Sequence, residues 1–362
     1  MKANPILINS LATIAGAIVA HGNPLTIYDG LNQTGPSAIV AANSRKTGTA
    51  IPNGLNDKIS SFKLQNGYGV CFGMSFRNVG ESKVYFANNG DRNVNLPTQL
   101  NDNVSFIRVF PIKTDVKKKG HAGTNTALGK AVGASWYYLW SDGGSDGTDG
   151  LKYVPMKWGI GTPSTFADKW ASIGVSHMLA FNEPDNPNQA NATVANAVTS
   201  YEDLLACGLT MGSPVVEQDK YKTWLKDFMA DCKTKKLRVD FLAAHWYDWG
   251  NQTNVSTGAQ IKDRLSAKMT DLRTQIGGSQ YIWLTEFNAN PNRTKQSDHA
   301  AFISSAIGWM NSTSWMQRYA YFQNGGGKFE TGTPPTLSES GKAYRDAPNA
   351  NAGYGIQSNL GY

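Results

Sequence analysis

Two glutamates lie at or near the ends of apolar runs, where a carboxyl group can take part in catalysis. Glu183 follows Asn182 at the end of HMLAFN (177–182), and Glu286 lies near the end of YIWLTEF (281–287). Cleavage of a glycosidic bond needs one carboxyl to protonate the leaving oxygen and a second on the other face of the sugar. Each glutamate alone is also consistent with a helix cap or a surface charge. The pair together favours glycoside hydrolysis.

An alternation of strands and helices would bring these carboxylates together. The expected strands are 119–122, 135–140, 153–158, 177–182, 209–214, 240–247, 281–287 and 318–323. The expected helices include 125–132, 221–233 and 260–276. This order predicts parallel βα units closed into a (β/α)8 TIM barrel, with Glu183 after strand four and Glu286 on strand seven. Both side chains would then face one mouth.

Other side chains at the expected strand ends are candidate substrate contacts. They are Trp140, Trp158, His245, Trp246 and Tyr247. Indole rings stack on the apolar faces of sugars, although each Trp is equally consistent with a buried core position. We interpret His245 as an orienting hydrogen-bond partner, and we expect Tyr247 to bond to Glu286.

Residues 117–346 resemble the catalytic domain of glycoside hydrolase family 128, which is related to fungal alkali-sensitive-linkage cell-wall proteins. The motifs in chain order are SWYYLW, YVPMKWG, FNEPD, GSP, HWY, WLTEF and GKAY. The resemblance implies a retaining barrel acting on β-1,3-glucan, with Glu183 as acid/base and Glu286 as nucleophile. It also implies that Asn182 lies near the sugar 2-hydroxyl.

We therefore expect a secreted endo-β-1,3-glucanase whose partner is β-glucan. The alternatives are a noncatalytic β-glucan-binding cell-wall protein and a hydrolase of another β-glucan linkage. Loops at the cleft set linkage choice, and a motif does not reveal their shape.

Residues 24–110 contain an internal repeat. LNDKISSFKL at 55–64 recurs as LNDNVSFIRV at 100–109. Alternating apolar residues and glycine turns predict a two-unit β-sandwich. The pattern resembles the βγ-crystallin double Greek key. We expect this unit to fold independently and to assist catalysis.

The repeated motifs of this sandwich raise the question of calcium. The candidate oxygen ligands for calcium are Asn56, Ser60, Asn101 and Ser105. Lys58 places a cation in the first motif, and Phe106 replaces the final Ser of the second. In the alternative, which we favour, the polar side chains hold their loops through local hydrogen bonds.

Composition excludes several other classes of function. The net charge of +7 is spread thinly, so a nucleic-acid partner is not expected. The five histidines lack the close spacing of a zinc site, and no cofactor is expected for catalysis. We expect a monomer without a membrane partner.

The chain ends and the cysteines complete the predictions. Residues 1–20 have the pattern of a secretory signal peptide, and an amphipathic helix is the alternative. Secretion would place the protein outside the cell or in the cell wall. Cys207 and Cys232 would form a disulfide with Cys71 left over, or all three would be buried thiols. We expect residues 347–362 to be a flexible tail.

Overall fold

The structure is a computed structural model. It describes residues 23–113, 115–161, 170, 174–251, 256–355 and 359–360. The expected signal peptide, residues 1–20, lies outside the described residues. None of the described helices is long and apolar enough to cross a membrane.

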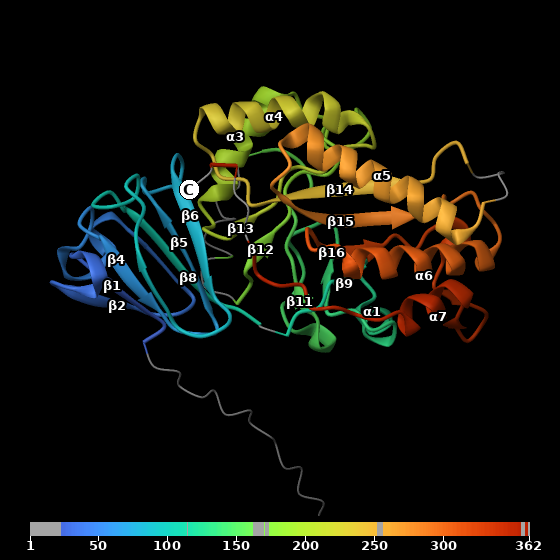
Figure 1. Ribbon diagram of the computed structural model, residues 1–362, viewed down its shortest axis with the longest axis horizontal. Helices are drawn as coiled ribbons and strands as arrows, with labels where there is room; N and C mark the ends of the chain where they lie inside the picture. The colour runs from blue at the N-terminus through green and yellow to red at the C-terminus, as the bar shows by residue number, and fades with distance from the viewer. Residues whose placement is uncertain are drawn as a thin grey trace, which may run out of the picture.

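The N-terminal part consists of two four-stranded antiparallel sheets. Its strands are β1 (Leu25–Tyr28), β2 (Ser37–Val40), β3 (Ser44–Thr47), β4 (Ser61–Leu64), β5 (Tyr68–Gly73), β6 (Ser82–Ala87), β7 (Arg92–Asn95) and β8 (Phe106–Pro111). The sheet orders are β2-β1-β4-β7 and β3-β8-β5-β6. The third strand of each repeat thus pairs with a strand of the other repeat, β7 with β4 and β3 with β8. This exchange ties the two repeats into one unit, coloured from blue to teal in Figure 1.

The rest of the chain is mixed α/β. Its strands are β9 (Lys119–Ala122), β10 (Trp136–Tyr138), β11 (Lys152–Tyr153), β12 (His177–Met178), β13 (Thr210–Met211), β14 (Phe241–Tyr247), β15 (Tyr281–Asn288), β16 (Met316–Tyr321), β17 (Glu330–Thr331) and β18 (Thr336–Leu337). Six form a parallel sheet in the order β11-β10-β9-β16-β15-β14, and β12 and β13 form a separate parallel pair. Isolated parallel bridges join Met156 to Leu179 and Gly212 to Phe241, which links that pair to both edges of the sheet. All eight expected strand positions therefore carry parallel pairing, although three of these strands have only two regular residues.

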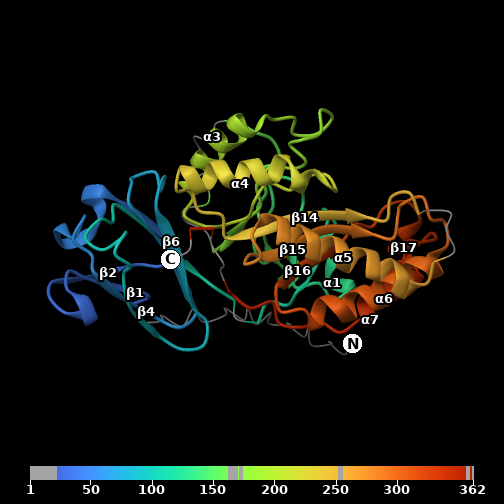
Figure 2. The same cartoon turned by 45° about the horizontal axis from the view of Figure 1, so that its top comes forward.

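Helices cover the outside of these strands (Figures 1 and 2). They are α1 (Thr126–Ala131), α3 (Val194–Leu205), α4 (Trp224–Thr234), α5 (Gly258–Ile276), α6 (Gln296–Ser312) and α7 (Glu339–Asp346). The short 3₁₀ helices are η1 (Leu31–Gln33), η2 (Gly48–Ala50), η3 (Pro52–Gly54), η4 (Thr148–Gly150), η5 (Lys220–Lys222) and η6 (Gly325–Gly327). A capping box from Thr257 and Gln260 begins α5, and Gly277 ends it with a left-handed φ of 119°. The expected helix at 260–276 is confirmed because these local signals fix both of its ends.

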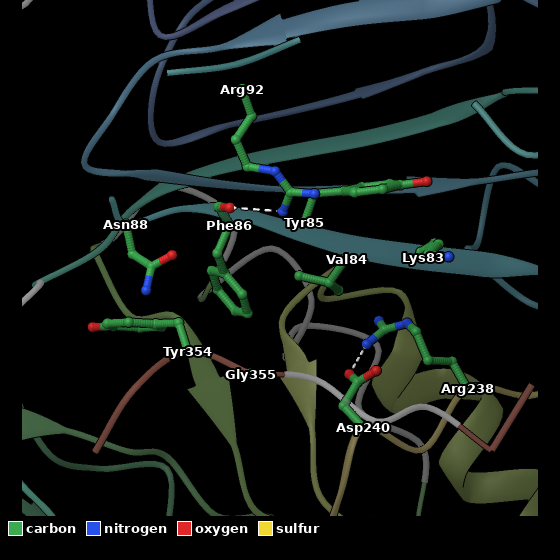
Figure 3. A pocket seen from close by; sticks show the side chains of 10 residues that line it. All are labelled: Lys83, Val84, Tyr85, Phe86, Asn88, Arg92, Arg238, Asp240, Tyr354 and Gly355. Atoms are coloured by element: carbon green, nitrogen blue, oxygen red, sulfur yellow. Dashed lines mark hydrogen bonds and ion pairs between the residues drawn. The ribbon is translucent and has the colours of Figure 1, made fainter. Parts of the chain in front are cut away.

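The sheet that contains β5, β6 and β8 packs against the α/β part. Phe86 and Phe106 belong to the same buried apolar cluster as residues of the α/β part. The buried Arg238 side chain pairs with Asp240 and donates to Ser82 Oγ (3.3 Å). Figure 3 shows this ion pair on one side of a cavity at the junction, facing strand β6. The sandwich also has a buried core of its own, and independent folding stays a prediction, with the added expectation that removal of the sandwich exposes the shared cluster.

The buried ion pair at the junction leads to a prediction about unfolding. Arg238→Met leaves Asp240 as an uncompensated buried charge, which is expected to lower the free energy of unfolding by about 3–5 kcal/mol. Lys236→Met is the matched control, because Lys236 pairs with Glu81 across the same junction but is 64% exposed. Urea unfolding followed by tryptophan fluorescence measures both. Equal urea midpoints for the two variants would show that the buried ion pair between Arg238 and Asp240 does not stabilise the fold.

The C-terminal residues are packed rather than free, so the prediction of a flexible tail is wrong for residues 348–355. Asn351 forms a bridge with Lys117. Tyr354 is 6% exposed, its hydroxyl donates to Lys113 O (2.5 Å), and its ring packs on Phe86 at 5.1 Å. Burial of this aromatic ring anchors the segment, which composition alone did not indicate.

The three cysteines are buried free thiols, so the predicted disulfide alternative is wrong. Burial raises the pKa of both Cys71 and Cys232, which keeps these thiols neutral. Cys71 lies at the junction, where its sulfur contacts Asn78 and Arg238. These residues therefore act as small core side chains.

Candidate active site

Backbone contacts hold Glu183 just beyond β12. Its amide donates to Val215 O (2.7 Å), and the amide of Asn182 donates to Trp158 O (2.8 Å). Glu183 has a φ of 42°, a left-handed conformation that costs a non-glycine residue about 1–3 kcal/mol. The hydrogen bonds to neighbouring strand segments hold Glu183 in this conformation. They keep its carboxylate at the C-terminal end of the parallel strands.

A register irregularity between β14 and β15 sets the position of Glu286. Ala244 pairs with Leu284, but the next residue, His245, pairs with Glu286, so Thr285 is passed over. Successive side chains of a strand point to opposite faces, and one extra residue changes which of them faces a neighbour. The irregularity therefore places the Glu286 carboxylate beside His245.

His245 lies between the two glutamates. Its Nδ1 is 2.9 Å from Glu183 Oε1, and its Nε2 is 3.4 Å from Glu286 Oε1. Burial by itself would lower the pKa of His245, but the charges of Glu286 and Glu183 outweigh burial and raise that pKa. The His245 ring thus contacts one carboxylate oxygen of each glutamate, so both carboxylates lie beside the same side chain.

Three aromatic side chains donate hydrogen bonds to Glu286. Trp140 Nε1 donates to Oε1 at 2.7 Å, and the Tyr138 hydroxyl lies 3.4 Å from the same oxygen. The Tyr247 hydroxyl donates to Oε2, as expected from the sequence. Burial and the charge of Glu286 raise the pKa of both tyrosines, so both remain protonated donors. These contacts fix the orientation of the Glu286 carboxylate.

Two further carboxyl groups lie on the Glu183 side. Asp185 Oδ1 accepts a hydrogen bond from the Glu217 amide (3.1 Å), and Glu217 Oε1 accepts from Asn186 Nδ2 (2.7 Å). Burial raises the pKa of Asp185, and burial together with the charge of Asp185 raises the pKa of Glu217. Each of these two carboxyl groups therefore releases its proton at a higher pH than an exposed carboxyl group does.

A cavity of about 710 Å³ contains both glutamates. Five expected contacts also line it: Trp140, Trp158, Asn182, His245 and Tyr247. Trp246 does not, because it is 2% exposed and its ring packs on Phe302 of α6 at 5.6 Å. Alternation along β14 explains this error: His245 and Tyr247 point into the cleft, and Trp246 points toward the helices.

Asn182 carries a buried acceptor inside this cavity. Its Nδ2 donates to Gln189 Oε1 (3.3 Å), whereas its Oδ1 has no hydrogen-bond partner among the described residues. A buried polar atom of this kind is satisfied when a ligand supplies a donor. A sugar hydroxyl has the required chemistry.

The sequence reasoning missed several residues of the cavity. They are Asn186, Gln189, Glu217, Gln218, Trp249, Pro291, Phe322 and Asn324. Trp249 follows Tyr247 by two residues, and Phe322 directly follows β16, so their positions past strand ends were a usable signal. Glu217 and Gln218 come from the loop after β13, whose path carried no such signal.

The candidate calcium motifs are linked to each other across the sandwich. Ser60 Oγ donates to Asp102 Oδ1 (2.9 Å), and Ser105 Oγ donates to Asp57 Oδ1 (2.8 Å). The side chains of Asn56 and Asn101 donate to the other oxygens of these aspartates. Within the described ranges, no group of three or more His, Cys, Asp or Glu side chains could hold a metal. The four side-chain hydrogen bonds to Asp57 and Asp102 support the interpretation that these polar side chains hold their loops.

The bridging histidine leads to a prediction about pH. Protonated His245 stabilises the folded state, because its pKa is higher in the folded than in the unfolded chain. This stabilisation is complete below the unfolded pKa of about 6.5, and it is lost as the pH rises through the folded pKa. His245→Gln removes this proton. The melting temperature of the wild type is therefore expected to fall more steeply above neutral pH than that of the variant. Parallel curves from pH 5 to 9 would show that His245 keeps one protonation state.

Comparison with known proteins defines the class of this chain. Residues 116–344 match the family model described as the glycosyl hydrolase catalytic core, and the chain belongs to this family. More specifically, its catalytic domain is that of glycoside hydrolase family 128. No match was found among curated protein sequences.

Solved structures of this family include both enzymes and a binding protein. An endo-β-1,3-glucanase of Amycolatopsis mediterranei in complex with laminaritriose is 32% identical, with a TM-score of 0.54 over 64% of this chain and 99% of the other. A curdlan-specific exo-β-1,3-glucanase of Blastomyces gilchristii is 30% identical, with a TM-score of 0.51 over 63% and 97%. An oligosaccharide-binding protein of Trichoderma gamsii is 25% identical, with a TM-score of 0.50 over 64% and 93%.

Proposed function

We propose that this protein is a secreted, retaining endo-β-1,3-glucanase. The observation that carries the proposal is the bridging of Glu183 and Glu286 by His245 inside an aromatic cleft. Retaining enzymes hold their two carboxyl groups about 5 Å apart, whereas inverting enzymes leave room for a water between them. Because His245 contacts both carboxylates in one cleft, the two can act on the same glycosidic bond. The retaining course rests on the resemblance to glycoside hydrolase family 128.

The reaction follows from the different surroundings of the two carboxylates. Glu286, oriented by Trp140 and Tyr247, attacks the anomeric carbon while Glu183 gives its proton to the leaving sugar. Glu183 then takes a proton from water, which attacks the same carbon and releases Glu286. The unpaired oxygen of Asn182 is placed to accept a bond from a sugar hydroxyl.

The proposal includes the architecture around the site. We assign the eight parallel strands and their bridges to a (β/α)8 barrel, and the exchanged strands of the sandwich to a βγ-crystallin-like double Greek key. Secretion rests on the signal-like pattern of residues 1–20.

Product analysis on matched polysaccharides tests the activity. Purified protein is incubated with linear β-1,3-, β-1,4- and β-1,6-glucans, and released reducing ends are measured. Release from the β-1,3-glucan as a ladder of oligosaccharides is expected. Glucose as the sole early product would indicate an exo enzyme, and release from another glucan alone would overturn the linkage.

A second candidate is a noncatalytic β-glucan-binding protein. The observation that favours it is the oligosaccharide-binding protein of Trichoderma gamsii. Calorimetric binding of laminarihexaose without any release of reducing ends would identify this function.

Calcium is expected to have little effect on the protein. Because Asp57 and Asp102 already accept hydrogen bonds from Ser105 and Ser60, a cation would have to displace these contacts. Calcium in the millimolar range is therefore expected to shift the melting temperature of the full chain by less than about 2 °C, since a ligand stabilises the native state only above its Kd. A large shift that saturates at micromolar calcium, and that magnesium does not reproduce, would establish a metal site.

A further inference from the structure

A second groove adjoins the cleft on its Trp249 side. It has a volume of about 400 Å³ and lies between the loop that follows β14 and the outer surface of α5. Gln218, Tyr247 and Trp249 line both this groove and the cleft. The two hollows are therefore neighbours that share a wall rather than separate sites.

The shared wall is aromatic and faces solvent. Trp249 is 50% exposed, which is unusual for so large an apolar side chain, and it stacks on Tyr247 with ring centroids 5.1 Å apart. Tyr247 in turn donates to Glu286. The aromatic surface that begins at the reacting centre thus continues outward to the groove, and flat apolar rings of this kind stack on sugar rings.

The floor of the groove is polar and fixed in place. Asp248 is 2% exposed and receives two hydrogen bonds from Arg264, at 2.7 and 2.6 Å. Asn251 Nδ2 donates to the same carboxylate (3.2 Å). Since these contacts hold the Arg264 guanidinium before any ligand arrives, binding to it costs little ordering entropy.

The far side of the groove supplies hydrogen-bond acceptors. Asp271 accepts from the Tyr221 hydroxyl (2.5 Å) and pairs with Lys222 (3.0 Å). These hydrogen bonds lower the pKa of Asp271 to about 2, so it is ionised at any working pH. The groove therefore offers an aromatic face, a guanidinium donor and a carboxylate acceptor, which together match the ring face and hydroxyl groups of a neutral sugar.

We propose that this groove is an additional subsite region, which binds further glucosyl units of the β-glucan chain that occupies the cleft. The inference rests on the proposed function, because it takes the occupant of the cleft to be β-glucan. Its consequence is that affinity increases with chain length beyond what the cleft alone would give.

Filling the groove tests the proposal. Ala267 is an exposed residue of α5 that lines the groove, and Ala267→Trp places a large side chain in it. Ala259→Trp is the matched control, because it makes the same change at an exposed position of the same helix outside the groove lining. Both are made in the full chain carrying Glu286→Gln, so that bound oligosaccharides are not cleaved.

Calorimetry with laminaritriose and laminarihexaose gives the ratio of the two affinities. Ala267→Trp is expected to reduce the preference for the hexasaccharide about tenfold, and Ala259→Trp to keep the preference of the parent. Equal ratios in all three proteins, or no binding of either sugar, would overturn the subsite. If Ala267→Trp reduced the preference for the hexasaccharide but the wild type cleaved no glucan, the proposed hydrolase would be refuted and the subsite would be supported.

Discussion

Glu286→Gln is expected to reduce hydrolysis of β-1,3-glucan by at least about 10⁴-fold in kcat, the scale on which loss of an essential residue acts in a covalent mechanism. Glutamine keeps one oxygen as an acceptor for Trp140 Nε1, and its NH2 group can donate to the Tyr247 hydroxyl oxygen in place of the bond that this hydroxyl donates to Glu286, so the side chain keeps both neighbours. It cannot form the glycosyl-enzyme bond. Initial rates on linear β-1,3-glucan, with circular dichroism to establish folding, measure the effect.

The control for this loss is Glu202→Gln, which changes a carboxylate on α3 that pairs with Lys235 away from the cleft. It should behave as the wild type. Proton NMR of the first products supplies an independent check, because a double displacement releases the new reducing end in the β configuration. An α product would indicate inversion and remove Glu286 from the role of nucleophile.

Glu183→Ala is expected to reduce turnover of β-1,3-glucan by about 10²–10⁴-fold, the usual contribution of a general acid and base. The loss should be much smaller for an aryl glycoside whose leaving group needs no proton. Azide should then accelerate turnover and yield a glycosyl azide, because a small anion attacks the intermediate without help from a base. Chromatography of the azide product measures this directly.

The same azide treatment separates the roles of the two residues. Glu286→Ala forms no covalent intermediate, so azide should not produce a β-configured glycosyl azide from it. If azide gave this product with Glu286→Ala and not with Glu183→Ala, the assigned roles would have to be exchanged.

Much of the α/β part followed from local sequence signals. The expected strands coincide with parallel pairing at eight positions, and α5 begins and ends where its capping residues predict. Such features depend on contacts between residues close in the chain, which is why periodicity and caps reveal them. The positions of Glu183 and Glu286 at strand ends followed for the same reason.

The inner geometry of the site depended on contacts between distant residues. Thr285 has no partner in the pairing of β14 with β15, and this places Glu286 opposite His245. No local sequence pattern predicts such an irregularity. Trp249, rather than Trp246, faces the cleft because the strand has ended and the chain turns there. Aromatic composition could not distinguish the two.

The sequence by itself determined the residue types that do the chemistry, their places at strand ends and the repeat of the N-terminal unit. Only the tertiary structure decided that His245 joins the glutamates and that the sandwich shares a core with the α/β part. It also decided that Tyr354 anchors the C-terminal segment at this junction. The physical reason is that burial and register are properties of packed surfaces, and each surface here combines segments that lie far apart in the chain.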